Sequence, residues 1–346
     1  MKGRQVVLGH YNGEEAAALM EDGQLVDLIL DSGEDLAVGA ICRGVTERLM
    51  KGQGGVFVRL PDGQRGYLRE RSRISEGQPL LVQISGVAEE GKAIPLTPRL
   101  IFRGRYGLVT PMSPGINVSR RIRDSETRDH LTALARDCMA DRTHGMVIRS
   151  AAEHAEDEDI LRDLTPLIDL ADRILAEGEG DPDLLLDAPS PWEQAWTEWS
   201  DPQPDAVEEG EDAFETFGVL DAIDALLRDR VALPNSASAY IESTRALIAV
   251  DVNTGNDTSP AAALKANIAL ARDLPRQLRL RGLGGQVAVD FAPMPKRDRA
   301  TLDQVLGAAF KGDGTETTLV GWTAMGLYEI NRKRDRAPLA RLAGGR

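Results

Sequence analysis

The stretch RALIAVDVNTGND, residues 245–257, decides how this chain is interpreted. Its apolar first half predicts a buried strand, and the polar residues that follow include Asp251 and Asn253. Because burying an unpaired charge is costly, a carboxylate at a strand end is normally a cap, an ion-pair partner or a metal ligand. A second stretch, GGQVAVDFAPM at residues 284–294, repeats the pattern and ends its apolar run at Asp290.

The segment between the two strands predicts a long amphipathic helix. It reads SPAAALKANIALARDLPRQLRLRGLGG, residues 259–285, and we expect the helix to end at Gly282 or Gly284. A right-handed crossover through this helix makes the two strands parallel neighbours. Asp251 and Asp290 should then project from the same edge of a sheet, where ligand sites form in open α/β folds.

Two carboxylates placed that closely need a cation between them. A few oxygen ligands that leave room for water and phosphate suit Mg²⁺ or Mn²⁺. Asn253, two residues after Asp251, faces the same side of an extended chain and can orient a carboxylate, a metal-bound water or the substrate. The alternative is that Asp251 and Asp290 are two unrelated strand caps, and the residues alone leave both interpretations open.

The composition is that of a soluble globular protein with two or three domains, since the chain has 346 residues, 42% hydrophobic and 28% charged. It shows no apolar run of about 20 residues and no N-terminal signal core, so a cytoplasmic protein is expected. Two cysteines, Cys42 and Cys138, form no CxxC motif, so no disulfide framework and no zinc cluster within the chain are expected.

The net charge of −14 argues against a nucleic-acid partner only until its distribution is considered. Residues 153–216 contain 22 Asp and Glu against 2 Lys and Arg, whereas residues 264–346 contain 15 Lys and Arg against 8 Asp and Glu. The local field, not the net charge, decides whether a polyanion is attracted. The basic C-terminal region therefore remains compatible with a nucleic-acid partner.

Residues 35–98 are rich in short strands separated by glycine, which predicts a small closed barrel of the OB type. Such barrels bind single-stranded nucleic acid by stacking bases on aromatic side chains beside basic ones. Phe57 and Tyr67 lie on the two strands of a predicted hairpin, with Lys92 on a later edge. Packing of Phe57 in the barrel core is the alternative.

Residues 99–170 hold a further candidate site. Met146–Ile148 predicts a short strand, and Arg149 and Ser150 follow where the chain turns into a helix. An arginine and a hydroxyl at a helix start can bind a phosphate, although a surface ion pair is the alternative for such an arginine. Ser125 is predicted to cap the preceding helix.

The remaining segments predict simpler elements. We expect two strands in residues 1–34, helices and an acidic loop in residues 171–230, and alternating strands and helices from residue 233, with a single last strand beginning near Thr317.

Several long stretches, taken in order, resemble the ribonuclease E/G family of bacterial endoribonucleases. LPNSASAYIESTRALIAVDVNTG, followed by KANIALARDLPRQLRLRGLGGQVAVDF, resembles its catalytic region. VTPMSPGINVSRRI and GMVIRSAAEHAEDEDILRDL resemble its 5′-end sensor, and residues 35–98 resemble its OB-type RNA-binding barrel. The resemblance covers nearly the whole chain and is weakest between residues 171 and 230.

The resemblance implies an α/β fold of several subdomains. A ribonuclease H-like subdomain, residues 1–34 and 171–232, is interrupted by the barrel at 35–98 and the 5′-sensor region at 99–170. A deoxyribonuclease-I-like catalytic subdomain follows at 233–346.

The resemblance also assigns residues. It implies that Asp251 and Asp290 hold a catalytic Mg²⁺, with Mn²⁺ as a substitute, and that Asn253 assists. The residues that match the 5′-phosphate pocket are Arg149, Ser150 (where the family has threonine), Arg120 and, through its backbone, Leu108. Those that match the RNA-contacting positions of the barrel are Phe57, Tyr67 and Lys92.

The implied activity is Mg²⁺-dependent cleavage of single-stranded RNA to 5′-phosphate and 3′-hydroxyl ends, favouring 5′-monophosphorylated substrates, in the processing or decay of rRNA and mRNA. An RNA-binding protein of the same fold with weak or no nuclease activity is the alternative. The family's zinc-linking CPxC motif, small C-terminal domain and scaffold tail have no match in this sequence, and the loop between Gly255 and Leu264 is shorter than usual. We therefore expect a monomer or a zinc-independent dimer.

Overall fold

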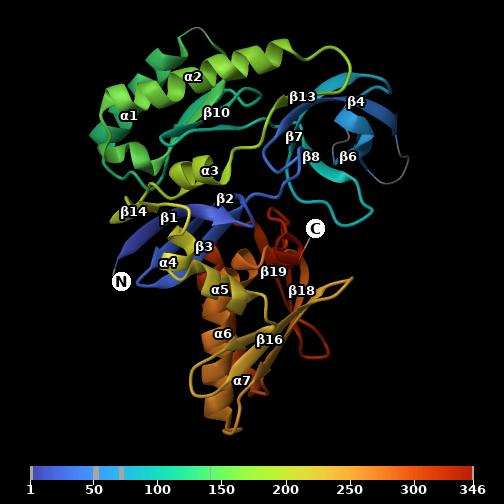
Figure 1. The fold of residues 1–346 in the computed structure, drawn as a ribbon, viewed down its shortest axis with the longest axis vertical. Helices are drawn as coiled ribbons and strands as arrows, with labels where there is room; N and C mark the ends of the chain where they lie inside the picture. Colours follow the sequence, from blue (N-terminus) through green and yellow to red (C-terminus); the bar gives the residue numbers. More distant parts are fainter. Residues whose placement is uncertain (1–2, 50–53, 70–73, 141, 345–346) are drawn as a thin grey trace. The chain divides into compact units, whose positions relative to one another are not determined.

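The chain forms two compact units in the computed structural model, which describes residues 3–49, 54–69, 74–140 and 142–344 (Figure 1). The first unit comprises residues 1–22 and 29–210, and the second comprises residues 23–28 and 211–346. Among the described residues, no helix is long and apolar enough to cross a membrane.

A closed five-stranded barrel lies in the first unit, as the sequence predicts. Its strands are β4 (Ile41–Leu49), β5 (Val56–Arg59), β6 (Arg65–Leu68), β7 (Pro79–Ile84) and β8 (Ile94–Thr97). They pair in the order β4-β5-β6-β8-β7, and pairing of β7 with β4 closes the ring. The architecture is consistent with an OB-like domain. Strand β13 (Asp183–Leu186) pairs with the first residues of β4 in the antiparallel direction.

A second sheet of the first unit lies under two helices (Figure 1). Its strands, in the order β11-β12-β10-β9, are Gly115–Val118, Gly145–Ile148, Gly107–Thr110 and Phe102–Arg103. The helices are α1 (Ser125–Met139) and α2 (Asp157–Ala176), with the short 3₁₀ helix η2 (Ser150–His154) before α2. Asp124 caps α1 by accepting a hydrogen bond from the Thr127 backbone, so the predicted cap at Ser125 is one residue late.

A third sheet has the order β14-β1-β2-β3, with strands at Ala206–Glu209, Arg4–Tyr11, Glu14–Glu21 and Gln24–Leu30. The prediction of two strands in residues 1–34 is wrong, because β2 forms a third. Residues 171–230 also hold β13 and β14 beside the helices α3 (Pro191–Glu198), α4 (Ala213–Thr216) and α5 (Val219–Leu226). The prediction of helices and an acidic loop for that segment is therefore wrong in two places, since both strands are missing from it and β14 lies within the predicted loop.

The second unit is built on a six-stranded sheet in the order β15-β16-β17-β18-β20-β19. These strands are Arg230–Ala232, Ser238–Ser243, Ile248–Asn253, Gly285–Asp290, Tyr328–Arg332 and Thr317–Trp322. The helices are α6 (Pro260–Leu280), α7 (Lys296–Lys311) and the terminal α8 (Leu339–Gly344). The predicted single last strand is instead a hairpin of β19 and β20.

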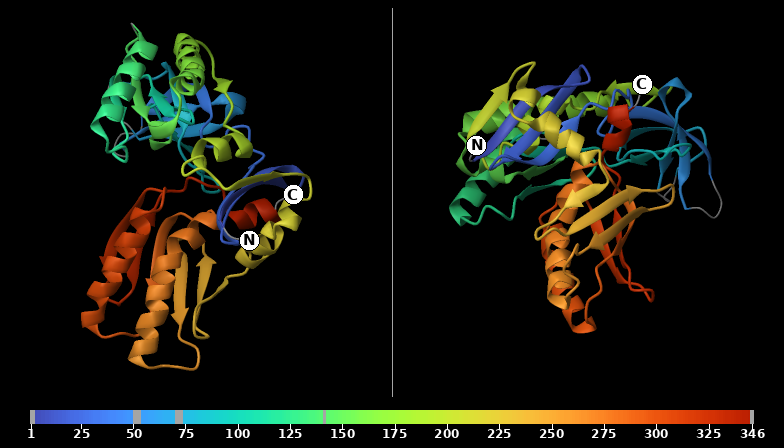
Figure 2. Two further views of the ribbon diagram at one scale, coloured as in Figure 1. Left: turned by 90° about the vertical axis from the view of Figure 1, so that its left-hand side faces the viewer. Right: turned by 60° about the horizontal axis from the view of Figure 1, so that its bottom comes forward.

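Helices α6 and α7 run side by side and pack on one face of this sheet (Figure 2). Ile248, Val250 and Val252 of β17 are buried on that face, while Asp251 and Asn253 alternate to the opposite, exposed face. Burial of apolar side chains on one face fixes the register, because a shift of one residue would turn the aspartate into the core.

The two ends of α6 explain the sharp turns that join this helix to β17 and β18. Ser259 caps the N-terminus by accepting a hydrogen bond from the Ala262 backbone. At the other end, Gly282 has a φ of +62° and the Leu283 amide donates to the Leu278 carbonyl, which is a Schellman-type ending. The predicted end of the helix at Gly282 is confirmed.

A chain of buried charges joins distant segments of the second unit. Asp27 of β3 pairs with Arg336 and Arg279, and Arg279 pairs in turn with Asp313. Asp313 also binds Arg332, and both side chains of that pair are only 1% exposed. The network ties residues 23–28 to α6, to β20 and to the segment before α8.

We predict that the Asp27 carboxylate makes the stability of the second unit depend on pH. Burial alone would raise its pKa, but the Arg336 and Arg279 guanidinium groups outweigh burial and hold the pKa below its ordinary value. A lowered folded-state pKa stabilises the fold above the unfolded value of about 3.9, and the contribution is lost as the pH falls toward the folded value.

The measurement is the free energy of unfolding of the parent and of Asp27→Asn between pH 7 and pH 3. The difference between the two proteins should be largest at neutral pH and should shrink on acidification. A difference that stays constant over this range would show that Asp27 does not titrate as the network requires.

Candidate active site

Asp251 and Asp290 lie directly side by side. Strands β17 and β18 are parallel, and their register pairs Asp251 with Asp290. Paired residues on neighbouring strands share a face, so both carboxylates project from the exposed face of the sheet about 5 Å apart along the strand-to-strand direction. The predicted parallel arrangement is confirmed, and the strands bring together the two residues that the sequence singled out.

Asn253 belongs to the same group. Its Nδ2 donates a hydrogen bond of 2.6 Å to Oδ2 of Asp251, which fixes the orientation of that carboxylate. Two residues later, Gly255 has a φ of +71°, and a Cβ at this position would come within 2.6 Å of the Ser236 carbonyl oxygen. Only glycine fits this turn, and the turn holds the segment after Asn253 against the neighbouring hairpin.

A buried amide supports the other aspartate. Asn267 of α6 is fully buried, and its side chain makes a pair of 2.9 Å hydrogen bonds, donating to the Ala292 carbonyl and accepting from the Ala292 amide. Ala292 follows Asp290 by two residues, so this clamp fixes the chain where it leaves β18. The role of Asn267 could not be predicted from the sequence, because a lone asparagine within an amphipathic helix gives no sign of its partner 25 residues away.

Aromatic rings pack beside Asp290. Phe291 lies 5.8 Å from Trp322 and 6.3 Å from Tyr328, measured between ring centroids, and Trp322 donates a hydrogen bond to Asp303. The Arg299 guanidinium lies 4.3 Å from the Trp322 ring centroid. These contacts give the end of β18 a rigid support.

The donor set fits a hard divalent cation. Two exposed carboxylates in register are like charges that a cation would relieve, and the oxygen atoms of Asp251 and Asp290 are its preferred ligands. Among the described residues there is no group of three or more His, Cys, Asp or Glu side chains placed to hold a metal. Two carboxylates supply only part of the coordination shell of such an ion, which would leave positions for water and phosphate.

The four predicted 5′-sensor residues lie at the same end of strands β10, β11 and β12. Arg149 and Ser150 follow β12, Arg120 lies in the turn after β11, and Leu108 is in β10. Leu108 pairs with Val147, two residues before Arg149, which places the ends of these strands together.

The side-chain hydrogen-bond donors of Arg149 and Ser150 are bound to other groups of the protein. Nη1 of Arg149 donates to the Gly104 carbonyl at 2.9 Å and to the Thr197 carbonyl at 2.7 Å. Burial lowers the pKa of the Arg149 guanidinium. The Ser150 hydroxyl donates to Oδ2 of Asp201 at 2.5 Å, and Nη1 of Arg121 lies 3.9 Å from the same oxygen. This position thus binds an anion, and the anion is a carboxylate of the chain.

The barrel residues Phe57 and Tyr67 form a cross-strand pair with their ring centroids 5.4 Å apart. Both are partly exposed, whereas Val56 and Val58 beside Phe57 are fully buried, so Phe57 faces away from the barrel core. The Arg65 guanidinium lies 4.7 Å from the Phe57 ring centroid. The alternative that Phe57 belongs to the core is wrong.

Lys92 lies in the turn before β8, whose Pro95 pairs with Tyr67. Its Nζ is 2.7 Å from Oε2 of Glu89. The exposed ammonium is therefore near the strand that carries Tyr67, and it has an acidic partner.

Comparison with known proteins assigns this chain to a family. The sequence model of the Ribonuclease E/G family matches residues 102–208 and 202–335, which include both aspartates and the residues predicted to form the 5′-sensor. The chain belongs to the ribonuclease E/G family.

Similar proteins of the family extend the match to the barrel. Ribonuclease E of Nostoc sp. is 28% identical over 99% of this chain and 57% of its own length. Ribonuclease G of Haemophilus influenzae is 25% identical over 94% of this chain and 78% of its own length, and ribonuclease G of Escherichia coli is 28% identical over 76% and 61%. The chain thus spans little more than half the length of its ribonuclease E relative from Nostoc.

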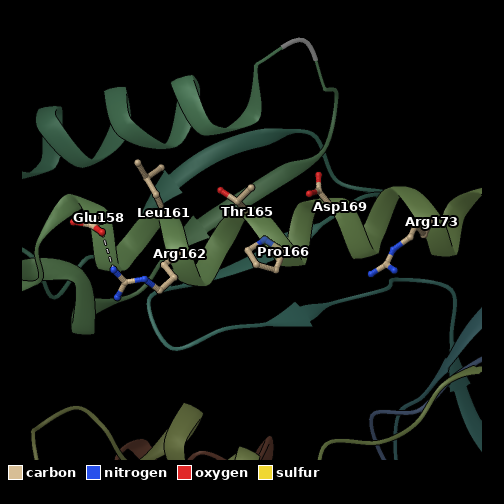
Figure 3. Close-up of a pocket in the computed structure, with 7 residues that line it drawn as sticks. All are labelled: Glu158, Leu161, Arg162, Thr165, Pro166, Asp169 and Arg173. Atoms are coloured by element: carbon tan, nitrogen blue, oxygen red, sulfur yellow. Dashed lines mark hydrogen bonds and ion pairs between the residues drawn. The ribbon is translucent and has the colours of Figure 1, made fainter.

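A surface hollow of about 690 Å³ on α2 is lined by none of the site residues described above (Figure 3). The residues that line it are Glu158, Leu161, Arg162, Thr165, Pro166, Asp169 and Arg173. All belong to one helix face, where Glu158 and Arg162 form an ion pair. A single exposed helix face without converging groups offers no catalytic chemistry.

Proposed function

We propose that this chain is a metal-dependent endoribonuclease that cleaves single-stranded RNA. The observation that carries the proposal is the register of Asp251 and Asp290 on adjacent parallel strands, with Asn253 bound to the first of them, in a member of the ribonuclease E/G family. The relatives named ribonuclease E and ribonuclease G support it.

Asp251 and Asp290 would hold Mg²⁺, or Mn²⁺ in its place, and the bound ion would polarise the scissile phosphate and lower the pKa of a bound water. Asn253 would hold the Asp251 carboxylate in one orientation through its hydrogen bond, so that this ligand is ordered before RNA binds. In the reaction, water attacks phosphorus in line with the P–O3′ bond, that bond breaks, and O3′ takes up a proton. The products carry a 5′-phosphate and a 3′-hydroxyl.

In this proposal the barrel binds the single-stranded RNA. Phe57 and Tyr67 present partly exposed rings on the outer surface, with the Arg65 guanidinium beside them. Every base has a face that can stack on such rings, so binding would tolerate many sequences.

The experiment that tests the proposal is to map the new ends after incubating the purified chain with an unstructured RNA and Mg²⁺. Hydrolysis as proposed leaves ends that a 5′-phosphate-dependent exonuclease degrades. A 2′,3′-cyclic phosphate would show that the RNA 2′-hydroxyl is the nucleophile, and the proposed chemistry would then be wrong.

We further propose that the edge formed by Arg149, Ser150, Arg120 and Leu108 recognises a 5′-monophosphate. The support is that Ser150 and Arg121 already face the anionic Asp201 there. A guanidinium and a hydroxyl satisfy one phosphate group, whereas a 5′-hydroxyl would leave these donors unpaired. Asp201 competes for the same donor, which would weaken the preference in the parent protein.

We predict that the parent cleaves 5′-monophosphorylated RNA about tenfold faster than 5′-hydroxyl RNA, since one charge-assisted contact contributes about 1.5–3 kcal/mol. Arg149→Ala should remove the preference and leave the rate on 5′-hydroxyl RNA unchanged, whereas Asp201→Ala should increase the preference. The measurement is kcat/KM on RNAs that differ only in their 5′ end.

The matched control is Arg162→Ala, which removes an exposed arginine from the same unit. It should behave as the parent does. Equal parent rates on the 5′-monophosphate, 5′-triphosphate and 5′-hydroxyl substrates would rule out the sensor.

A further inference from the structure

The two aspartates belong to a row of four side chains that crosses the second unit's sheet. Arg230 of β15 pairs with Tyr240 of β16, and Tyr240 pairs with Asp251 of β17. Asp251 in turn pairs with Asp290 of β18. A cation, an aromatic ring and two carboxylates therefore stand in line across four adjacent strands.

All four side chains of the row point to the same side. Directly paired residues on neighbouring strands share a face, and each member of the row is exposed. Tyr240 is 38% exposed, although its strand neighbours Ala239 and Ile241 are buried against the helices. The ring is thus held one strand, about 5 Å, from Asp251 without contributing to the core of the unit.

We propose that this row is a binding track for a single RNA strand, in which Tyr240 stacks on the base next to the scissile phosphate and Arg230 binds a backbone phosphate beyond it. The inference rests on the proposed nuclease function of Asp251 and Asp290, and it adds the residues that hold the substrate in register with them.

The chemistry of the row matches the order of groups in an RNA strand. The scissile phosphate lies at the carboxylate pair, the next base meets an aromatic face, and the next phosphate meets a guanidinium. Ring stacking does not depend on base identity, and a guanidinium binds phosphate through paired donors. Phosphates and flat bases alternate along an RNA strand but not along a polypeptide, so single-stranded RNA is the ligand that this row of side chains favours.

A cycle of protein and substrate changes tests the role of Tyr240. The substrate is a single-stranded RNA with one cleavage site, prepared intact or with an abasic nucleotide in turn on either side of the scissile phosphate. For the parent, loss of the stacked base should lower kcat/KM about tenfold. On the intact RNA, kcat/KM of Tyr240→Ala should be about tenfold below that of the parent. On the RNA that lacks the stacked base, kcat/KM of Tyr240→Ala should equal that of the parent. Tyr240→Phe should match the parent on both RNAs.

Trp196→Ala is the control, because it removes an aromatic ring that is 49% exposed in α3 and lies off the row. If Tyr240→Ala lowers kcat/KM by the same factor on intact and abasic RNAs, the role of Tyr240 is structural and the stacking inference is wrong. If Tyr240→Ala leaves kcat/KM unchanged on both RNAs, the stacking inference is equally wrong, and the nuclease function stands.

Salt dependence tests Arg230. Each phosphate contact that a protein loses lowers the slope of log affinity against log salt by about one. Arg230→Ala should therefore reduce that slope by about one, while Arg228→Ala, an exposed arginine just before β15, should leave it unchanged. Equal slopes for the parent and Arg230→Ala would remove Arg230 from the track.

Binding measured without cleavage separates this inference from the proposed function. In the Asp251→Asn background, a single-stranded RNA with 2-aminopurine beside the cleavage position should lose fluorescence on binding, and Tyr240→Ala should restore it. If the parent cleaves no RNA but the Tyr240-dependent quenching is present, the nuclease proposal fails and the track remains. Absence of quenching in a protein that cleaves RNA would overturn the track alone.

Discussion

Asp251→Asn and Asp290→Asn should each lower RNA cleavage about a thousandfold and leave RNA affinity within about twofold of the parent. Removing one carboxylate from the pair removes a ligand that acts in the transition state, and metal stabilisation of a phosphoryl transition state amounts to several kcal/mol. At about 1.4 kcal/mol for each factor of ten, that loss corresponds to the expected decrease. The measurement is single-turnover cleavage together with equilibrium binding.

The double variant should be no slower than either single variant, because both residues serve one site. Glu242→Gln is the matched control, since it removes an exposed carboxylate from the same face of the neighbouring strand β16 and should keep parent activity. Cleavage at the parent rate by either aspartate variant would mean that the pair is not the reaction centre.

The second large effect should be on stability. Asp313→Ala leaves the Arg332 guanidinium, which is 1% exposed, without its carboxylate partner, and it also removes one of the two carboxylate partners of Arg279. Breaking a buried ion pair by removing one member costs about 3–5 kcal/mol, because the remaining charge is uncompensated. We expect the free energy of opening of the second unit to fall by about this amount.

Hydrogen exchange of the β18 and β20 backbone amides measures that free energy within the second unit, and so avoids an assumption that the whole chain unfolds in one step. Arg297→Ala is the control, because Arg297 pairs with Asp298 while 85% exposed and should contribute less than about 1 kcal/mol. A loss below about 1 kcal/mol for Asp313→Ala would show that the network does not stabilise the fold.

The juxtaposition of Asp251 and Asp290 could be predicted from the sequence because it follows from local pattern alone. An apolar run leads to Asp251 and another to Asp290, and one helix of sufficient length joins the two strands. The handedness of the crossover then fixes the neighbours, and the alternation of buried residues fixes the face. No information from elsewhere in the chain is needed.

Strand β2 could not be predicted in the same way, because its local preference opposes its structure. Ala16, Ala17 and Ala18 favour a helix, yet they are fully buried in the middle of a sheet. Pairing with β1 and burial on the sheet determine their conformation. Strand β14, whose second half is Glu208 and Glu209, gives equally little local sign, since glutamate is depleted in strands.

Contacts between segments far apart in the sequence could not be predicted from local pattern either. Ser150 binds Asp201, and nothing in either segment indicates that these residues meet. The row formed by Arg230, Tyr240, Asp251 and Asp290 depends on the register of three separate strand pairings, which only the folded structure fixes. A linear pattern can locate a strand but cannot place three strands beside it in register.

The most direct test of the metal-dependent nuclease centre is the opening of a circular single-stranded RNA by the purified chain. A circle has no ends, so only an endonuclease can linearise it. We predict linear product with Mg²⁺, none after EDTA is added, and full recovery when Mg²⁺ is restored in excess. Linearisation at the same rate with and without EDTA, or an intact circle throughout in the presence of Mg²⁺, would contradict the account.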